Sequence, residues 1–283
     1  MEGSKKAAEV ASALKGMDTS KVEVDDDEQA PPAIACCSAE EAALAEALDT
    51  KLTEGGVMER WQAFKAASKN YKELPLMCLR GRKYDLEKAA ALLPALMGMI
   101  EDLGLETEAG RLAEDLQTHK ALAAGTKDEL GRALIWVRLR FHNPKASKAR
   151  DMARLVATVM LHTLSDPNVQ RLGIVVVNDM NGLKLKNLDP AAGKMIFSTV
   201  LSNLPIRVGR IVILNPPWLV GYIILPIAMS LMSAKLRSRI MVVNGTSTEP
   251  LFKVMPKSML PTDLGGEAHV DADGFVASVL AKI

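Results

Sequence analysis

The sequence predicts an α/β protein in which a mixed, mostly parallel sheet follows an all-helical N-terminal subdomain. Between residues 39 and 123, apolar residues recur mainly at helical spacing, whereas after Gly125 short β-branched runs alternate with amphipathic helices. Strands that alternate with helices are typical of parallel pairing, because each parallel connection has to cross over the sheet. At 283 residues and 48% hydrophobic content, the chain can bury a sizeable core.

The first 124 residues divide into a tail and a helical subdomain. Residues 1–38 pass through an acidic stretch at 23–28 into two prolines, a composition that predicts a disordered acidic tail without packing. Ser38 precedes two glutamates and is therefore expected to cap the first helix. Helices are expected over 39–53, 57–72, 85–103 and 106–123, with a further short one before Gly81, so that the subdomain spans 39–124.

Residues 125–283 form the expected α/β domain. The run 173–178 is uninterrupted and β-branched, which indicates a strand covered by helices on both faces. Further strands are expected at 133–141, 210–214 and 239–244, and helices at 148–164, at 190–204 and from Trp218 onward.

The formal net charge of +1 hides an uneven distribution. Residues 1–129 contain 16 Lys and Arg against 25 Asp and Glu, residues 130–248 contain 16 against 4, and residues 249–283 contain 3 against 5. The middle block is therefore both basic and apolar, which indicates an anionic partner. The near-neutral chain as a whole does not indicate nucleic-acid binding.

Residues 211–234 contain no formally charged side chain and are long enough to cross a bilayer. Pro216 and Pro217 interrupt them, so the expected helix runs from Trp218 to about Ser233, with a kink near Pro226. Cations stand on both sides of the segment, unlike the one-sided pattern that orients a spanning helix. Three interpretations of this segment are therefore possible: a central core helix, a helix between a lipid cavity and a membrane, or a transmembrane helix.

The sequence lacks the common motifs of enzymes and metalloproteins. It contains no Walker A, GxGxxG, GxSxG or CxxC pattern and no paired histidines. Asp179 is interpreted as a turn residue that closes a strand, and His162 as a core or rim residue. We therefore expect no enzymatic activity, no metal site and no cofactor. The charged start and three irregularly spaced cysteines predict a cytoplasmic location.

Five short motifs follow one another along the chain. They are LRGRKYDLEKA at 79–89, GRA at 131–133 with the strand to Arg140, GIVVVNDMNG at 173–182, LPIRV with IVILNPP at 204–217, and LPTDLGGE at 260–267. In this order they resemble the CRAL-TRIO family of lipid-binding proteins, whose members include tocopherol and retinaldehyde carriers and yeast-type phosphatidylinositol transfer proteins. The chain departs from that pattern at Leu204, where an aromatic residue is common. It departs again at Ile206, where the phosphatidylinositol branch has an acidic residue.

The resemblance implies a sheet that floors an apolar pocket and a mobile gate helix over 218–232 that closes it. The implied pocket and gate residues are Trp218, Leu219, Tyr222, Ile223, Leu225, Pro226, Ile227, Met229, Leu231 and Met232. The cations expected to meet anionic headgroups or the membrane are Lys83, Arg207, Arg210, Lys235, Arg237 and Arg239.

The expected function is to bind a hydrophobic ligand, such as a phospholipid, sterol or terpenoid, and to transfer or present it at membranes. Contact with the membrane would favour the open gate by burying its apolar surface in lipid. The expected partners are the lipid ligand and an anionic membrane surface, including phosphoinositides, with the protein a peripherally associated monomer that binds no nucleic acid. The alternatives are a lipid-sensing regulatory or scaffold module without transfer activity and a membrane-inserted protein that uses residues 211–234.

Overall fold

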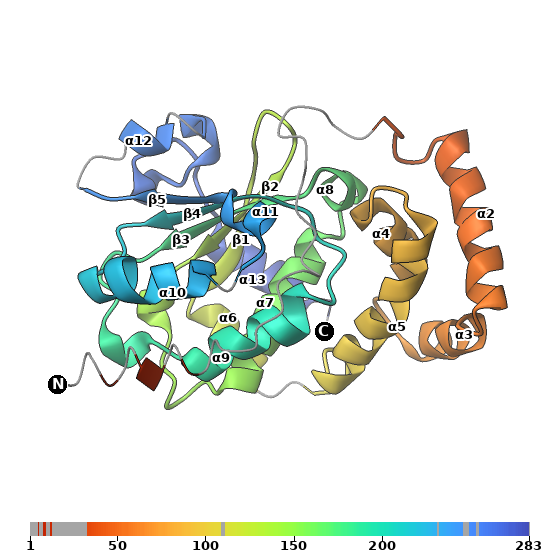
Figure 1. Ribbon diagram of the computed structural model, residues 1–283, viewed down its shortest axis with the longest axis horizontal. Helices are drawn as coiled ribbons and strands as arrows, with labels where there is room; N and C mark the ends of the chain where they lie inside the picture. The colour runs from red at the N-terminus through yellow and green to blue at the C-terminus, as the bar shows by residue number, and fades with distance from the viewer. Residues whose placement is uncertain are drawn as a thin grey trace.

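A computed structural model describes residues 5, 8, 9 and 12 and residues 33–282, apart from 109, 110, 231, 246–248, 253 and 254. A five-stranded sheet with the order β1-β2-β3-β4-β5 lies at its centre (Figure 1). The strands are β1 (Ala121–Lys127), β2 (Ala133–Val137), β3 (Ile174–Asp179), β4 (Val208–Leu214) and β5 (Ile240–Val243). β1 pairs antiparallel with β2 and the other pairs are parallel, so the predicted mixed, mostly parallel sheet is confirmed.

The three parallel crossovers advance in the same direction across the sheet. Because such crossovers are right-handed, their helices collect on one face, and Figure 1 shows α7, α9 and α10 below the sheet. The crossover elements are η1 (Leu139–Phe141), α7 (Ala149–Thr163), α8 (Pro167–Leu172), η2 (Leu185–Asn187), α9 (Pro190–Met195), η3 (Ile196–Leu201), η4 (Val220–Ile224), α10 (Leu225–Ser230) and α11 (Ala234–Arg237). The opposite face is covered by α12 (Glu249–Phe252), η5 (Lys257–Met259) and η6 (Thr262–Leu264), and α13 (Ala272–Leu280) returns to pack on β1 and α7.

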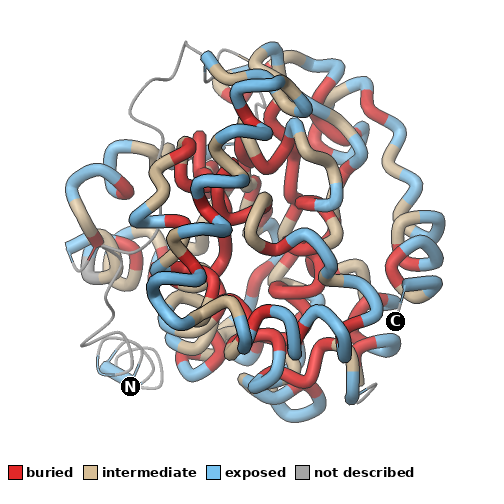
Figure 2. The backbone as a smooth tube through the Cα atoms, turned by 90° about the vertical axis from the view of Figure 1, so that its right-hand side faces the viewer, coloured by how far each residue is buried: buried red, intermediate tan, exposed pale blue. Residues whose placement is uncertain are grey.

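Alternate side chains of each central strand enter two separate cores, as the period-2 geometry of a strand requires. In β2, Ile135 joins the large core beneath the crossover helices, whereas Leu134 and Trp136 join a smaller core under α12, η5 and η6. Figure 2 shows these buried stretches gathered in the interior of the molecule. Both faces of the sheet are therefore covered, as the run at 173–178 predicts.

The helical subdomain stands beside the sheet and consists of α2 (Ala39–Glu54), α3 (Met58–Ala67), α4 (Leu74–Gly81) and α5 (Leu86–Asp102) (Figure 1). Ser38 caps α2 as predicted, since its hydroxyl accepts a hydrogen bond from the Glu41 backbone amide. α4 packs against α8 and joins the subdomain to the α/β domain. At its end, Gly81 lies so close to Pro205 that a Cβ would collide with the Pro205 carbonyl.

One helix predicted in the N-terminal half is wrong over most of its length. The helix expected over 106–123 is shortened to α6 (Leu112–Gln117), and the following residues form β1, which the sequence reading did not anticipate. The alanines of β1 favour a helix locally, but pairing with β2 overrides that preference. The predicted domain boundary between residues 124 and 125 consequently falls inside a strand of the sheet.

The predicted unpacked tail extends too far toward the C-terminus. Ile34 packs against the large core, and its backbone carbonyl accepts a hydrogen bond from Arg171. The thiol of Cys36 lies 3.4 Å from the carbonyl oxygen of Pro167. Packing against the core is therefore already present at Ile34. The acidic stretch at 23–28 lies outside the described residues.

Candidate functional site

The last crossover of the sheet carries the segment that the sequence singled out as a gate. This gate segment, residues 218–232, begins as a helix at Trp218, is π-helical through η4 and continues as α10. Trp218 is 68% exposed and Tyr222 is 72% exposed, and their rings lie 6.5 Å apart on adjacent turns. Two large aromatic side chains thus stand together in solvent at the start of the segment.

The π-helical turn of the gate segment has a local cause in the sequence. Pro226 has no backbone N–H and cannot continue the α-helical ladder, so the turn before it must find another hydrogen-bonding pattern. The widened turn of η4 ends directly before Leu225 and Pro226. The disturbance expected at Pro226 therefore takes the form of a π-helical turn, a feature often found at functional sites.

The gate segment turns only part of its apolar surface inward. Leu219, Leu225 and Met232 are buried, Ile223 and Met229 are half-buried, and Pro226 is exposed. Leu231 lies outside the described residues, as does the side chain of Ile227. The segment is therefore neither a fully buried core helix nor uniformly exposed, and its outward face is apolar at the positions of the two aromatic residues.

An apolar cavity of about 410 Å³ lies beside the start of the gate segment. It is lined from the gate side by Pro217, Trp218, Leu219 and Val220 and from the loop after β3 by Leu183, Lys184, Leu185 and Leu188. This gate cavity has an apolar lining apart from one lysine. Its volume is at the lower end of the range for small-molecule pockets.

The start of the gate segment is anchored to the carboxyl ends of the parallel strands. Asn215, which has a left-handed backbone (φ +48°), donates a hydrogen bond from Nδ2 to the Asn181 side chain (3.0 Å) and accepts one from the Gly245 amide (2.8 Å). Asn181 in turn donates to Asp179, whose other carboxylate oxygen pairs with Arg140 at 2.5 Å. The chain of hydrogen bonds fixes the point from which the gate segment leaves the sheet.

Asp179 thereby has the structural role that the sequence predicted. It is 2% exposed, and its Oδ1 accepts the backbone N–H of Asn181, which closes a turn after β3. Its carboxylate is fully engaged by this turn and by Arg140. Among the residues that the structure describes, no cluster of three His, Cys, Asp or Glu side chains could hold a metal ion.

The predicted cations fall into different environments. Lys235 and Arg237 are exposed on α11, directly after the gate segment, and Arg239 is half-buried in the turn before β5. Arg210 is half-buried in β4. The Ile211 amide donates to the Arg239 carbonyl, which brings the backbones of these two positions together. We call Lys235, Arg237 and Arg239, which follow the gate segment in the chain, its basic flank.

Arg207 and Lys83 also lie outside that flank. Arg207 is only 2% exposed, and its guanidinium donates to the backbone carbonyl of Arg171, so in this structure it cannot contact a membrane surface. Lys83 is half-buried at the end of α4, in a left-handed backbone conformation (φ +56°). Its neighbour Arg82 donates to the Leu204 carbonyl, which ties the first sequence motif to the fourth.

A buried group of polar residues joins the helical subdomain to the α/β domain. We call it the charged joint: Glu41, Arg80, Tyr84 and Gln170. Arg80 donates two hydrogen bonds of 2.8 Å to the Glu41 carboxylate and one of 2.9 Å to the Gln170 side chain. Tyr84 also donates to Glu41, at 2.9 Å. The side chains of Arg80 and Glu41 are 3% and 4% exposed, so this ion pair is almost completely removed from water.

The charged joint strongly favours the ionised form of Glu41. Hydrogen bonding from Arg80, together with the amide of Cys37 and the hydroxyl of Tyr84, lowers the pKa of Glu41 to about 2 despite burial. No motif in the sequence points to this group. The one available signal is Arg80 itself, a charge in the otherwise apolar run LPLMCLRG that requires a partner once it is buried.

None of the described helices is both long and apolar enough to cross a bilayer. The helical part of the gate segment runs only from Trp218 to Ser230, which is shorter than the roughly 20 residues that a membrane-spanning helix needs.

The fold and the site define a class of domain, in which a singly wound α/β sheet carries an apolar cavity beside an exposed apolar segment. The family model described as the CRAL/TRIO domain matches residues 116–266, more than half of the chain. The protein belongs to the CRAL/TRIO family, and the membership predicted from the sequence motifs is confirmed.

Individual relatives are distant. The chain is 24% identical over 198 residues to tyrosine-protein phosphatase non-receptor type 9 of Homo sapiens, a match covering 68% of this chain and 32% of the phosphatase. It is 23% identical over 200 residues to clavesin-1 of Rattus norvegicus, a match that covers 68% of this chain and 56% of clavesin-1. The match to phosphatidylinositol transfer protein CSR1 of Eremothecium gossypii is 23% identical over 222 residues and covers 72% of this chain and 49% of the transfer protein.

The matches therefore span between about a third and just over half of the length of these relatives. Among solved structures, the crystal structure of Sfh5 matches with a TM-score of 0.47 and 14% identity, over 75% of this chain and 85% of that chain.

Proposed function

We propose that this protein binds a hydrophobic ligand beside the gate segment and transfers or presents it at membranes. The observation that carries the proposal is the apolar gate cavity, walled on one side by a segment whose Trp218 and Tyr222 face solvent. Exposed tryptophan and tyrosine side chains are favourable at a membrane–water interface, where an apolar ring and a polar edge are both accommodated. Family membership and a phosphatidylinositol transfer protein among the relatives support the proposal.

Membrane contact and ligand exchange are coupled in this proposal. The gate segment leaves the aqueous phase when Trp218 and Tyr222 enter the interface, which favours the state in which the cavity is open. The basic flank holds the same side of the protein against anionic headgroups, each cation near the surface contributing about 1 kcal/mol. Phosphoinositides are the expected headgroups. The ligand is carried without bond chemistry, so we propose no enzymatic activity.

Native mass spectrometry tests ligand uptake. The purified protein is incubated with a mixed extract of phospholipids, sterols and terpenoids, separated from free lipid and measured intact. We expect a bound species that adds the mass of one lipid and that is lost after organic extraction. A protein that takes up no component of the extract would overturn the proposal.

A second candidate is a lipid-sensing module that recruits a partner or regulates a neighbouring domain. It is favoured by one observation, namely that the phosphatase relative extends far beyond the matched region, which is 32% of its length. A transfer assay between donor and acceptor vesicles separates the two candidates. Ligand uptake with transfer supports the carrier, and uptake without transfer supports the sensor.

A membrane-inserted protein that uses residues 211–234 is the third alternative from the sequence. In the structure, this stretch includes β4 residues and the gate segment rather than one long helix. Carbonate extraction of membranes tests the point, because a peripheral protein is released and an inserted one is retained.

A further inference from the structure

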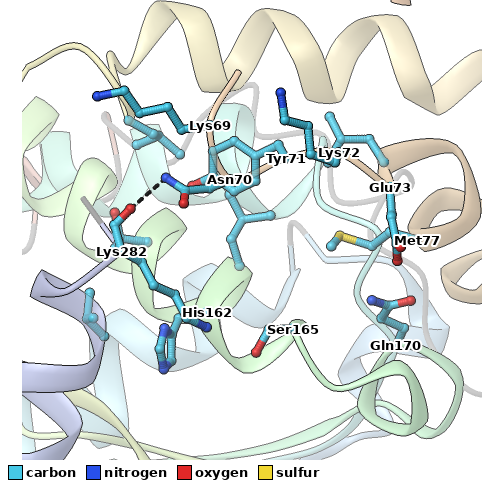
Figure 3. A pocket seen from close by; sticks show the side chains of 15 residues that line it. Lys69, Asn70, Tyr71, Lys72, Glu73, Met77, His162, Ser165, Gln170 and Lys282 are labelled. Carbon is cyan, nitrogen blue, oxygen red and sulfur yellow. Dashed lines mark hydrogen bonds between the residues drawn. The ribbon is translucent and has the colours of Figure 1, made fainter. Parts of the chain in front are cut away.

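A second cavity, of about 420 Å³, lies at the seam between the helical subdomain and the α/β domain. In Figure 3, Asn70, Tyr71, Lys72 and Glu73 from the linker before α4 run along one side, and His162, Ser165 and Gln170 lie on the other. We call it the seam cavity. It shares no lining residue with the gate cavity, and its walls contain buried Leu74, Leu105, Leu161 and Val279.

One residue of the seam-cavity lining has a buried hydroxyl group that lacks a hydrogen-bond partner in the described part of the chain. Thr158 lies within α7, lines the cavity and is 6% exposed, and its Oγ1 is unpartnered. A threonine inside a helix normally donates to the carbonyl four residues earlier, as Thr163 of the same helix does to Val159 at 2.7 Å. Leaving such a group unsatisfied is unfavourable, and an acceptor in the cavity would remove that cost.

The charged groups around the seam cavity favour an anion. Lys69, Lys72 and Lys282 line it against a single glutamate, Glu73. In Figure 3, the side chain of Lys282 extends toward His162. Burial and the charge of Lys282 lower the pKa of His162. The imidazole contacts the Ser278 hydroxyl through Nε2 at 3.2 Å and packs edge-on against Phe275. Within the lining, three ammonium groups face one carboxylate, and just outside it the Glu106 carboxylate accepts hydrogen bonds from the backbone amides of Lys69 and Asn70.

We propose that the seam cavity is a second binding site, which takes a small amphipathic anion made of an apolar body and one carboxylate or phosphate group. The apolar walls cover the body, Lys282 attracts the acidic group, and the hydroxyl of Thr158 donates to an oxygen of the ligand. Because the lining comes from the linker before α4, from α7 and from α13, an occupied site stabilises the contact between the two parts of the protein. The proposal is independent of what binds at the gate cavity.

Isothermal titration of the full chain with hexyl phosphate tests the proposal, with inorganic phosphate and 1-hexanol as the separated halves of the probe. We expect hexyl phosphate to bind at one seam site, at least about tenfold more tightly than either half, since both the apolar walls and the cations contribute. The variant Thr158→Val removes only the hydroxyl, and we expect it to weaken binding about tenfold. The variant Ser165→Trp places a large ring on an exposed cavity residue and should abolish this site.

The matched control is Thr163→Val, on the same helix, whose hydroxyl bonds within the helix and does not line the cavity. It should leave the affinity for hexyl phosphate unchanged. A thermal melt without ligand checks folding, and Thr158→Val should melt no lower than the wild type because it removes an unsatisfied group. No binding of hexyl phosphate, equal binding of 1-hexanol, or equal affinity in the wild type, Thr158→Val and Ser165→Trp would each overturn the proposal.

Discussion

The gate segment and the charged joint are held in place by different kinds of interaction. The charged joint connects α2, α4 and α8 through a buried ion pair and directional hydrogen bonds. The gate segment, beyond its anchor at Asn215, is held by apolar packing of residues such as Leu219 and Leu225 and leaves two aromatic rings in water. Apolar contact is non-directional and can be exchanged for contact with lipid, whereas a buried ion pair cannot be opened cheaply. This difference supports the proposal that the charged joint stays fixed while the gate segment moves.

The largest expected effect comes from breaking the charged joint. In Arg80→Met, the carboxylate of Glu41 remains buried without its cation, and we expect a loss of about 3–5 kcal/mol in the free energy of unfolding. The matched control is Lys51→Met, which removes an ion pair with Glu87 whose side chains are 30% and 79% exposed. That change should cost about 0–1 kcal/mol. Urea denaturation measures both, and equal losses would refute the role of the joint.

The same joint predicts a pH dependence of stability. The pKa of Glu41 is about 2 in the folded protein against an ordinary value of 4.5, so the folded state favours the ionised carboxylate. This stabilisation is complete above about pH 4.5 and is lost as the pH falls toward 2, an effect of about 3 kcal/mol. Urea denaturation between pH 6 and pH 2.5 should show a steeper decline for the wild type than for Glu41→Gln. Parallel curves would contradict the assignment.

The basic flank of the gate segment predicts a smaller effect, on membrane binding rather than on stability. Lys235→Glu combined with Arg239→Glu should weaken binding to phosphatidylserine vesicles by about 1 kcal/mol for each charge near the surface. The difference should shrink at high salt, because screening weakens surface electrostatics. Co-sedimentation measures the binding. The control, Lys51→Glu with Lys65→Glu in the helical subdomain, changes the net charge equally and should have little effect, whereas an equal loss would remove the argument for a local flank.

The smallest expected effect on stability comes from the exposed aromatic residues. Trp218→Ser removes a side chain that is 68% exposed, so the free energy of unfolding should change by no more than about 0.5 kcal/mol. Its neighbour Leu219 is 9% exposed, and Leu219→Ala should cost about 2 kcal/mol. Urea denaturation compares the two. A large loss in Trp218→Ser would show that the aromatic pair stabilises the fold instead of serving an interface.

The fold was predictable where local and tertiary preferences agree. β3 is a continuous β-branched run, and the sequence locates it within a residue of its observed start and end. β1 contains three alanines and a glycine, and only its pairing with β2 makes it a strand. A single sequence does not show which strands pair with each other.

The sequence predicts which segments carry the candidate site, but not how their side chains are oriented. The sequence suggests six cations for contact with headgroups or the membrane, but it does not reveal that Arg207, one residue before β4, turns inward to the Arg171 carbonyl. Nor could it identify Glu41 as the partner of Arg80, because the two residues are 39 positions apart and many acidic residues were available. Such contacts depend on how helices pack, which composition and periodicity do not specify.

The most direct test of the account is whether the gate segment enters the membrane while the rest of the protein stays folded. The chain has three tryptophans, and Trp218 is exposed while Trp61 and Trp136 are 5% and 3% exposed. Brominated lipids quench only the rings that reach the acyl chains, so vesicles of brominated phosphatidylserine should quench Trp218 and leave the emission of Trp218→Phe unchanged. Unquenched emission from vesicle-bound wild-type protein, or equal quenching in Trp218→Phe, would contradict a gate that opens at the membrane.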